Sequence, residues 1–188
     1  GTKLGAIMGV LGSIGYGTMK EEINKNYIGV DKGHFPVENI THDEAVEFVR
    51  RLSKMTNINF SLPTEEEWEY AARGGQKSKH YRFAGSDNIE DIAWYRDNAN
   101  RSTHPVGEKQ PNELGIYDMC GNVWEWTETL AYSYAIDVKP KGNCFIRRGG
   151  SWWQEEKNCR VSRRYASDHS KKTRGLGLRL VIRKNIEK

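Results

Sequence analysis

The feature that constrains the fold most is the placement of the helix signals, which stop early in a chain of 188 residues. In "THDEAVEFVRRLSKMTN", Thr41 and Glu44 have the spacing of a capping box, in which each side chain bonds the backbone of the other residue. Apolar residues then recur at intervals of three and four, as on one buried face of a helix. The pattern predicts a helix over about 42–55.

A second helix is predicted in "LPTEEEWEYAARGG", where Thr64 and Glu67 repeat the capping-box spacing and Gly74-Gly75 ends the helix. His42, in the first turn of the first helix, is expected to face solvent. The residues expected to be buried are Ala45, Val46, Phe48, Val49, Leu52 and Met55 in the first helix and Trp68, Ala71 and Ala72 in the second.

No further helix is predicted beyond position 76. Short β-prone pieces, separated by Gly, Asn, Asp and Pro, replace the helical pattern. They are "HYRFA", "IAWY", "HPVG", "GIYDM", "NVWEWT", "CFIRRGG" and "GLRLVIR". Two early helices followed by many short strands indicate a single, loop-rich α+β domain over 34–188, preceded by an irregular, glycine-broken segment over 1–33.

The bulk composition excludes two classes of partner. A formal charge of +4 is too small to indicate nucleic acid, and the chain has no apolar run of about 18 residues that could span a membrane. Much of the positive charge is concentrated in one region, which is either a solvated face or an anion-binding surface. That region contains Arg160, Arg163, Arg164, Lys171, Lys172 and Arg174.

Several segments, taken in order, resemble the motifs of the formylglycine-generating enzyme family, also called the sulfatase-modifying factor family. They are "FPVENITHDEAVEF", "LPTEEEWEYAARGG", "HPVGEKQPNELGIYDMCGNVWEWT", "RRGGSW", "NCRVSRR" and "GLGLRL". The resemblance implies a compact relative of the C-type lectin domain. Family domains usually carry additional strands before the "PVENI" block, so the start of the domain is expected to be shortened here.

The resemblance also allows a test for the family's oxidase activity. The enzymes oxidise a cysteine of a sulfatase to formylglycine with oxygen and copper, and two thiolates hold the soft Cu(I) ion. These cysteines lie three and eight residues after the serine of the "GGS" motif. Counted from Ser151, the positions are Gln154 and Cys159. The first thiol is therefore missing, and we expect Cys159 to be a buried structural residue and copper chemistry to be absent.

Other thiols and the histidines do not restore a catalytic metal site. Cys120 and Cys144 belong to other motifs, and the sequence gives no reason to place either beside Cys159. A second branch of the superfamily uses non-haem iron held by clustered histidines. The five histidines here are scattered, so they do not support iron catalysis.

The motif match places two residues, Ser151 and Trp124, in the lining of the family's active-site cleft. Aromatic and polar side chains that follow the serine suit a flat or sugar-like ligand, since rings stack while Arg and Ser donate hydrogen bonds. The predicted ligand-binding residues are Trp152, Trp153, Gln154, Arg160, Arg163 and Tyr165.

A calcium site is implied by "YDMCGNVWEW". Family members bind Ca²⁺ here, and the match gives the side chains of Asp118 and Glu125 and the carbonyls of Gly121 and Val123 as ligands. All four are hard oxygen donors. The alternative is a turn in which Asp118 bonds backbone amides and Glu125 pairs with an arginine.

These observations favour a non-catalytic binding domain that recognises a glycan or a protein through the cleft and the C-terminal loop surface. One alternative is a formylglycine-generating oxidase with altered metal ligation. Another is a structural module of a surface assembly. The compartment stays open, because free thiols favour a reducing interior while related bacterial domains are commonly exported to the cell surface.

Overall fold

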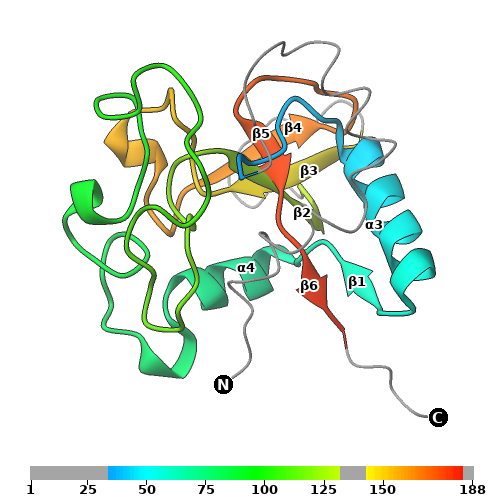
Figure 1. Cartoon of the computed structure of the whole chain (residues 1–188), viewed down its shortest axis with the longest axis horizontal. Helices are drawn as coiled ribbons and strands as arrows, with labels where there is room; N and C mark the ends of the chain where they lie inside the picture. Colours follow the sequence, from blue (N-terminus) through cyan, green and yellow to red (C-terminus); the bar gives the residue numbers. More distant parts are fainter. Residues whose placement is uncertain (1–33, 132–142, 184–188) are drawn as a thin grey trace.

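The computed structural model describes residues 34–131 and 143–183, so the predicted irregular segment over 1–33 lies outside the described residues. Figure 1 shows a curled sheet at the centre, with α3 at one flank, α4 beneath it and a group of long loops on the other side. The elements, in chain order, are α3 (His42–Thr56), β1 (Phe60–Ser61), α4 (Glu65–Ala72), η2 (Gly75–Lys77), η3 (Ile89–Asp91), β2 (Trp124–Leu130), β3 (Cys144–Arg148), η4 (Glu156–Asn158), β4 (Arg164–Asp168), β5 (Leu176–Leu178) and β6 (Val181–Ile182). The predicted loop-rich α+β domain is confirmed.

Both predicted helices are present and both capping boxes are formed. The Thr41 hydroxyl accepts from the Glu44 amide, and the Glu44 carboxylate accepts from the Thr41 amide. Thr64 and Glu67 make the same reciprocal pair at the start of α4. Each box satisfies two amides that would otherwise have no partner at a helix start.

The buried face of α3 is narrower than predicted. Ala45, Val49 and Leu52 are buried, whereas Val46 is 46% exposed and Met55 is 67% exposed. The expectation that His42 faces solvent is wrong, since its ring is buried, stacks on Phe145 with centroids 3.6 Å apart and meets the Thr127 carbonyl at 3.0 Å. The first turn of α3 therefore packs against β2 and β3, and only one stripe of the helix is covered.

Four strands form the main sheet in the order β4-β3-β2-β5, and β1 pairs with β6 in a separate two-stranded sheet. The pairing of β2 with β5 is parallel, whereas β3 is antiparallel to both β2 and β4. Side chains alternate between the two faces of a strand. Trp124 and Trp126 therefore point to the face covered by α3, and Glu125 points to the face covered by α4.

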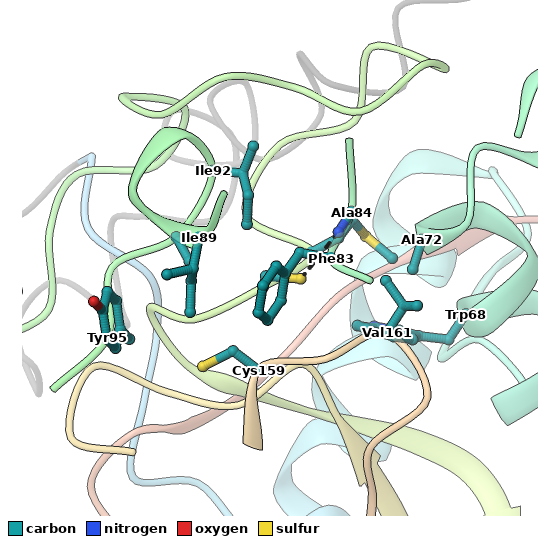
Figure 2. Close-up of a cluster of buried hydrophobic side chains, with 12 residues drawn as sticks. Trp68, Ala72, Phe83, Ala84, Ile89, Ile92, Tyr95, Cys159 and Val161 are labelled. Atoms are coloured by element: carbon teal, nitrogen blue, oxygen red, sulfur yellow. Dashed lines mark hydrogen bonds between the residues drawn. The ribbon is translucent and has the colours of Figure 1, made fainter. Parts of the chain in front are cut away.

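Two hydrophobic cores result, one on each face. The sheet core, on the α3 face, consists of Ala45, Val49, Leu52, Phe60, Leu62, Trp124, Trp126, Leu176 and Leu180. The loop core, part of which Figure 2 shows, consists of Trp68, Ala72, Phe83, Ala84, Ile89, Ile92, Ala93, Tyr95, Met119, Cys120, Cys159 and Val161.

Between α4 and β2 the predicted strands are wrong. "HYRFA", "IAWY", "HPVG" and "GIYDM" form no strand, and this region contains only η2, η3 and an isolated bridge from Trp94 to Gly121. Side chains bond the backbone here in place of a ladder. The Asn112 carboxamide bonds the amides of Leu114 and Ile116 and the Ala71 carbonyl, and Asn122 is bonded to the backbone of His104 in both directions. Conversely, β4 was not among the predicted pieces.

Within the described residues, the helices are too short or too polar to cross a membrane.

Candidate functional site

Two glycine turns bury Ser151. Gly150 has φ of +80°, and an added Cβ would lie 2.7 Å from the Cys159 sulfur, so only glycine fits. Gly175 has φ of +74°, and a Cβ added to it would lie 3.1 Å from the Ser151 hydroxyl oxygen. Ser151 is fully buried, and its Oγ has no hydrogen-bond partner. The serine that the motif match assigned to the family's cleft is thus present and held between the two turns.

Gln154 and Cys159, at the two positions that bear copper ligands in the enzymes, are both held by contacts within the protein. The Gln154 side chain accepts from Asn158 Nδ2 at 2.9 Å, and its carbonyl accepts from the Arg96 amide. Cys159 has no exposed surface, and burial raises the pKa of its thiol far above the usual range. Figure 2 shows Cys159 below the Phe83 ring, in the loop core with Ile89 and Tyr95. Cys159 is therefore buried, as the sequence predicted.

A second thiol shares the loop core, which the sequence did not indicate. Cys120 is 1% exposed, its sulfur accepts from the Ala84 amide at 3.3 Å, and burial raises the pKa of its thiol to about 12. The charge interaction between Cys120 and Cys159 also contributes to the raised pKa of Cys159. Both thiols are protonated at neutral pH, and a protonated thiol is a poor metal ligand.

The predicted ligand-binding residues divide between two places. Trp152 is half-buried, with its indole N–H 3.5 Å from Glu38 and the Arg174 guanidinium 5.6 Å from its ring centre. Trp153 is 44% exposed and donates to the Arg174 carbonyl at 3.3 Å. These residues and Gln154 lie just before η4, whereas Tyr165 lies on β4.

The two predicted arginines both precede β4. Arg160 is exposed and donates from Nε to the Lys157 carbonyl at 3.1 Å. Arg163 is half-buried, and its Nε has no partner.

A cluster that the sequence did not predict joins Trp124 to Tyr165 through Arg147. The Arg147 guanidinium lies 5.0 Å from the centre of the Trp124 ring and 4.5 Å from that of Tyr165. Arg147 is 8% exposed, and burial lowers its pKa to about 10. Its Nε and Nη1, and the Trp124 indole N–H, have no hydrogen-bond partner. We call Trp124, Arg147 and Tyr165 the Arg147 cluster.

The turn assigned to calcium has its carboxylates partly engaged. Asp118 has φ of +56°, and its Oδ2 accepts from the Gly107 amide at 2.7 Å. Glu125 is 2% exposed; its oxygens accept two bonds of 2.8 Å from Arg179 and one of 2.6 Å from the Trp68 indole N–H. These contacts match the alternative in which Glu125 pairs with an arginine.

The charge at this turn nevertheless fits a cation. Asp118 and Glu125 interact through their charges, and Arg179 is a cation whose charge acts on both. Burial, the largest cause, raises the pKa of Asp118 above its usual value of 3.8. When both acids are ionised, these three described residues carry one excess negative charge, which a cation would offset. Among residues 34–131 and 143–183, no three His, Cys, Asp or Glu side chains are placed so that they could hold a metal ion together. A cation here would therefore also need the carbonyls of Gly121 and Val123.

The family described as "Sulfatase-modifying factor enzyme 1-like domain" matches residues 17–184. The chaperone protein LppX of Paenibacillus barcinonensis is 34% identical over 77% of this chain and 56% of its own length. The formylglycine-generating enzyme of Streptomyces coelicolor is 30% identical over 77% of this chain and 51% of its own length.

A third relative carries the word inactive in its name. The inactive C-alpha-formylglycine-generating enzyme 2 of Bos taurus is 33% identical over 65% of this chain and 40% of its own length. The chain therefore spans about half the length, or less, of these relatives.

Among solved structures, Treponema denticola variable protein 1 superposes with a TM-score of 0.72 at 27% identity. The superposition covers 81% of this chain and 73% of that one.

Proposed function

This chain belongs to the sulfatase-modifying factor family, and we propose that it is a non-catalytic member that binds a ligand through the region around Ser151 and β4. The observation that carries the proposal is the environment of the two positions that bear thiolates in the enzymes. Gln154 offers no sulfur, and the Cys159 thiol is fully buried. Cu(I) is held well by two thiolates, whereas the thiols of Cys159 and of Cys120 in the same core are both enclosed, and burial disfavours their ionised form.

The relatives support a non-catalytic role without fixing the ligand. One is named a chaperone and one an inactive form of the enzyme, although others are named formylglycine-generating enzymes. The scaffold therefore occurs both with and without the enzymatic activity.

An oxidation assay tests the non-catalytic part of the proposal. The chain is incubated with Cu(I), oxygen and a peptide that contains Cys-x-Pro-x-Arg, with the Streptomyces coelicolor enzyme as positive control. We expect aldehyde from the control and none from this chain. Aldehyde above the level of a no-protein blank would contradict the proposal and favour an oxidase with altered metal ligation.

Exposed aromatic and basic residues are the surface on which we place the ligand. Trp153 and Tyr165 are 44% and 47% exposed, and Arg160 is exposed beside them in the sequence. Aromatic rings and arginine are the side chains most often found at the centre of binding interfaces. A glycan array and a pull-down from the native cell, each repeated with Trp153→Ala, distinguish a glycan from a protein partner. Binding in neither assay would favour a structural module.

The proposal includes a calcium ion at the Asp118 turn, held by Asp118, Glu125 and the carbonyls of Gly121 and Val123. The ion would supply the positive charge that Arg179 alone does not provide there. Thermal unfolding in CaCl₂, MgCl₂ and chelator tests this. We expect calcium to raise the Tm, Asp118→Asn to abolish the rise, and Asp97→Asn, at an exposed aspartate, to retain it. An identical Tm in calcium and chelator would remove calcium from the proposal.

A further inference from the structure

The Arg147 cluster presents hydrogen-bond donors without acceptors. Arg147 Nε and Nη1 and Trp124 Nε1 are buried and have no partner. Arg147 is 92% enclosed, since its exposed fraction is 8%, and Trp124 is 1% exposed. Buried polar groups in folded proteins almost always have a partner, and a charged group that lacks one is costly. Three donors in one cluster without an acceptor among residues 34–131 and 143–183 therefore point to an acceptor that a ligand supplies.

No acid among the described residues neutralises Arg147. The ion pairs formed by residues 34–131 and 143–183 do not include it, whereas its neighbour Arg148 contacts both Glu65 and Glu69. The acid that reaches the adjoining Gly175 loop is Glu38, whose carboxylate already accepts from the Gly175 amide and faces the Trp152 indole. Arg147 thus retains its positive charge between two rings.

The surroundings favour a compact anion. Trp124 and Tyr165 hold the guanidinium by cation–π contacts at 5.0 and 4.5 Å, and the Tyr165 side chain also hydrogen-bonds it. The enclosed Nε and Nη1 atoms have no acceptor among the described residues. Tyr165 is the exposed member of the cluster and lies on β4, the edge strand of the sheet. A ligand therefore approaches Arg147 beside the Tyr165 ring.

On these grounds we propose that Arg147 binds a carboxylate of the ligand, with the Trp124 indole N–H as a second donor. The inference rests on the proposed binding function and names the chemistry that this surface selects. A carboxylate offers two oxygens to a guanidinium, and a charge-assisted bond of this kind is about twice as strong as a neutral one. The carboxylate belongs either to a sugar acid or to an amino acid, and the same atoms of the protein serve both.

Titration with paired probes tests the inference. D-glucuronate is compared with D-glucose, and N-acetyl-L-glutamate with N-acetyl-L-glutamine, by calorimetry and by tryptophan fluorescence. We expect at least one acid to bind about tenfold or more tightly than its neutral partner. Binding of only the sugar acid assigns the carboxylate to a glycan, and binding of only the amino acid assigns it to a protein. No difference within either pair, including no binding at all, overturns the inference.

Variants connect the preference to Arg147. Arg147→Leu should remove the preference for the acid, and Arg147→Lys should retain part of it because the charge remains. Arg51→Leu removes one exposed arginine of α3 and should leave the preference unchanged. An acid preference that survives in folded Arg147→Leu, checked by circular dichroism, would overturn the assignment. The oxidation assay above can fail independently of these titrations, so the two proposals are tested separately.

Discussion

Arg147 and Arg148 are consecutive residues of β3 that point to opposite faces of the sheet. On the α4 face, Arg148 is fully buried and bonded to Glu65 at 2.7 Å, to Glu69 at 2.5 Å and to the Val161 carbonyl at 2.5 Å. On the α3 face, Arg147 is almost as enclosed but contacts rings and no described carboxylate. Both have an unpartnered Nε, so the difference lies in the acids.

The contrast indicates that the charge of Arg148 stabilises the fold, whereas the charge of Arg147 is the one that we assign to a ligand. The two acids linked to Arg148 are buried Glu65 and half-buried Glu69. They extend the α4 face into a network, because Glu65 also binds Arg164 and the neighbouring Glu125 binds Arg179 and Trp68. A buried ion pair of this kind is costly to break, whereas an unpaired buried charge is costly to keep. Substitutions on the two faces should therefore have unequal consequences.

The largest effect is expected from Arg148→Leu. The change leaves Glu69 and one oxygen of Glu65 without their buried partner, and it should lower the free energy of unfolding by about 3–5 kcal/mol. Urea denaturation followed by tryptophan fluorescence measures this loss. Arg50→Leu, which removes an exposed partner of Glu47, should cost less than about 1 kcal/mol. Equal losses of unfolding free energy in Arg148→Leu and Arg50→Leu would show that the buried ion pairs of Arg148 do not stabilise the fold more than an exposed pair does.

Trp68→Phe tests the next contact on the α4 face. It keeps a ring in the loop core but removes the 2.6 Å bond to the Glu125 carboxylate. Hydrogen bonds to charged groups contribute about 1.5–3 kcal/mol, so the free energy of unfolding should fall by that amount. Tyr70→Phe, at a tyrosine that is 54% exposed, should change stability by less than about 0.5 kcal/mol and serves as the control.

The pH dependence of stability tests the burial of His42 on the α3 face. Burial lowers the pKa of this imidazole below 6.5, with smaller opposing effects from the Thr127 carbonyl and Asp43 and a small lowering effect from His169. Its contribution to stability is complete above pH 6.5 and is lost as the pH falls from 6.5 through the lower folded pKa, because the unfolded chain takes up the proton first.

The expected size of this loss is about 1.4 kcal/mol for each unit by which the pKa is lowered. In His42→Phe, the free energy of unfolding should fall less steeply between about pH 7 and pH 5 than in the unchanged chain. The same slope in both proteins would show that other groups dominate the acid sensitivity.

The smallest effect is expected from Arg147→Leu in the absence of ligand. Loss of the cation–π contacts is offset by removal of an enclosed, unpaired charge, so stability should change by no more than about 1 kcal/mol in either direction. Chemical denaturation provides the measurement. A loss as large as that of Arg148→Leu would mean that Arg147 is part of the structural core and would weaken its assignment to ligand binding.

Local sequence signals predicted the helices well, since a capping box needs only residues three apart and both boxes are formed. They failed between α4 and β2, where β-prone pieces form loops because Asn112 and Asn122 bond backbone groups that a ladder would otherwise use. A local sequence pattern does not describe packing between residues that are distant in the sequence. Such packing also explains why His42 is buried.

The candidate site was predictable only in part. The motif match assigned Ser151 and Trp124 to one cleft, and the missing thiol at Gln154 could be counted directly from the serine. Arg147 was missed because two adjacent arginines appear equivalent until the register of β3 assigns them to opposite faces. The proximity of Cys120 to Cys159 depends on loops that no sequence periodicity describes.

The position of β5 in the sheet has a consequence for biosynthesis. Trp124 and Trp126 are paired in parallel with Leu176 and Leu178, and β6 then completes the small sheet on β1. A nascent chain emerging from the ribosome must therefore expose two indole rings until the segment that contains β5 and β6 has been translated. Ribosome-bound intermediates halted before that segment should be substrates for general chaperones and prone to aggregate, even though α3 and α4 have already been synthesised.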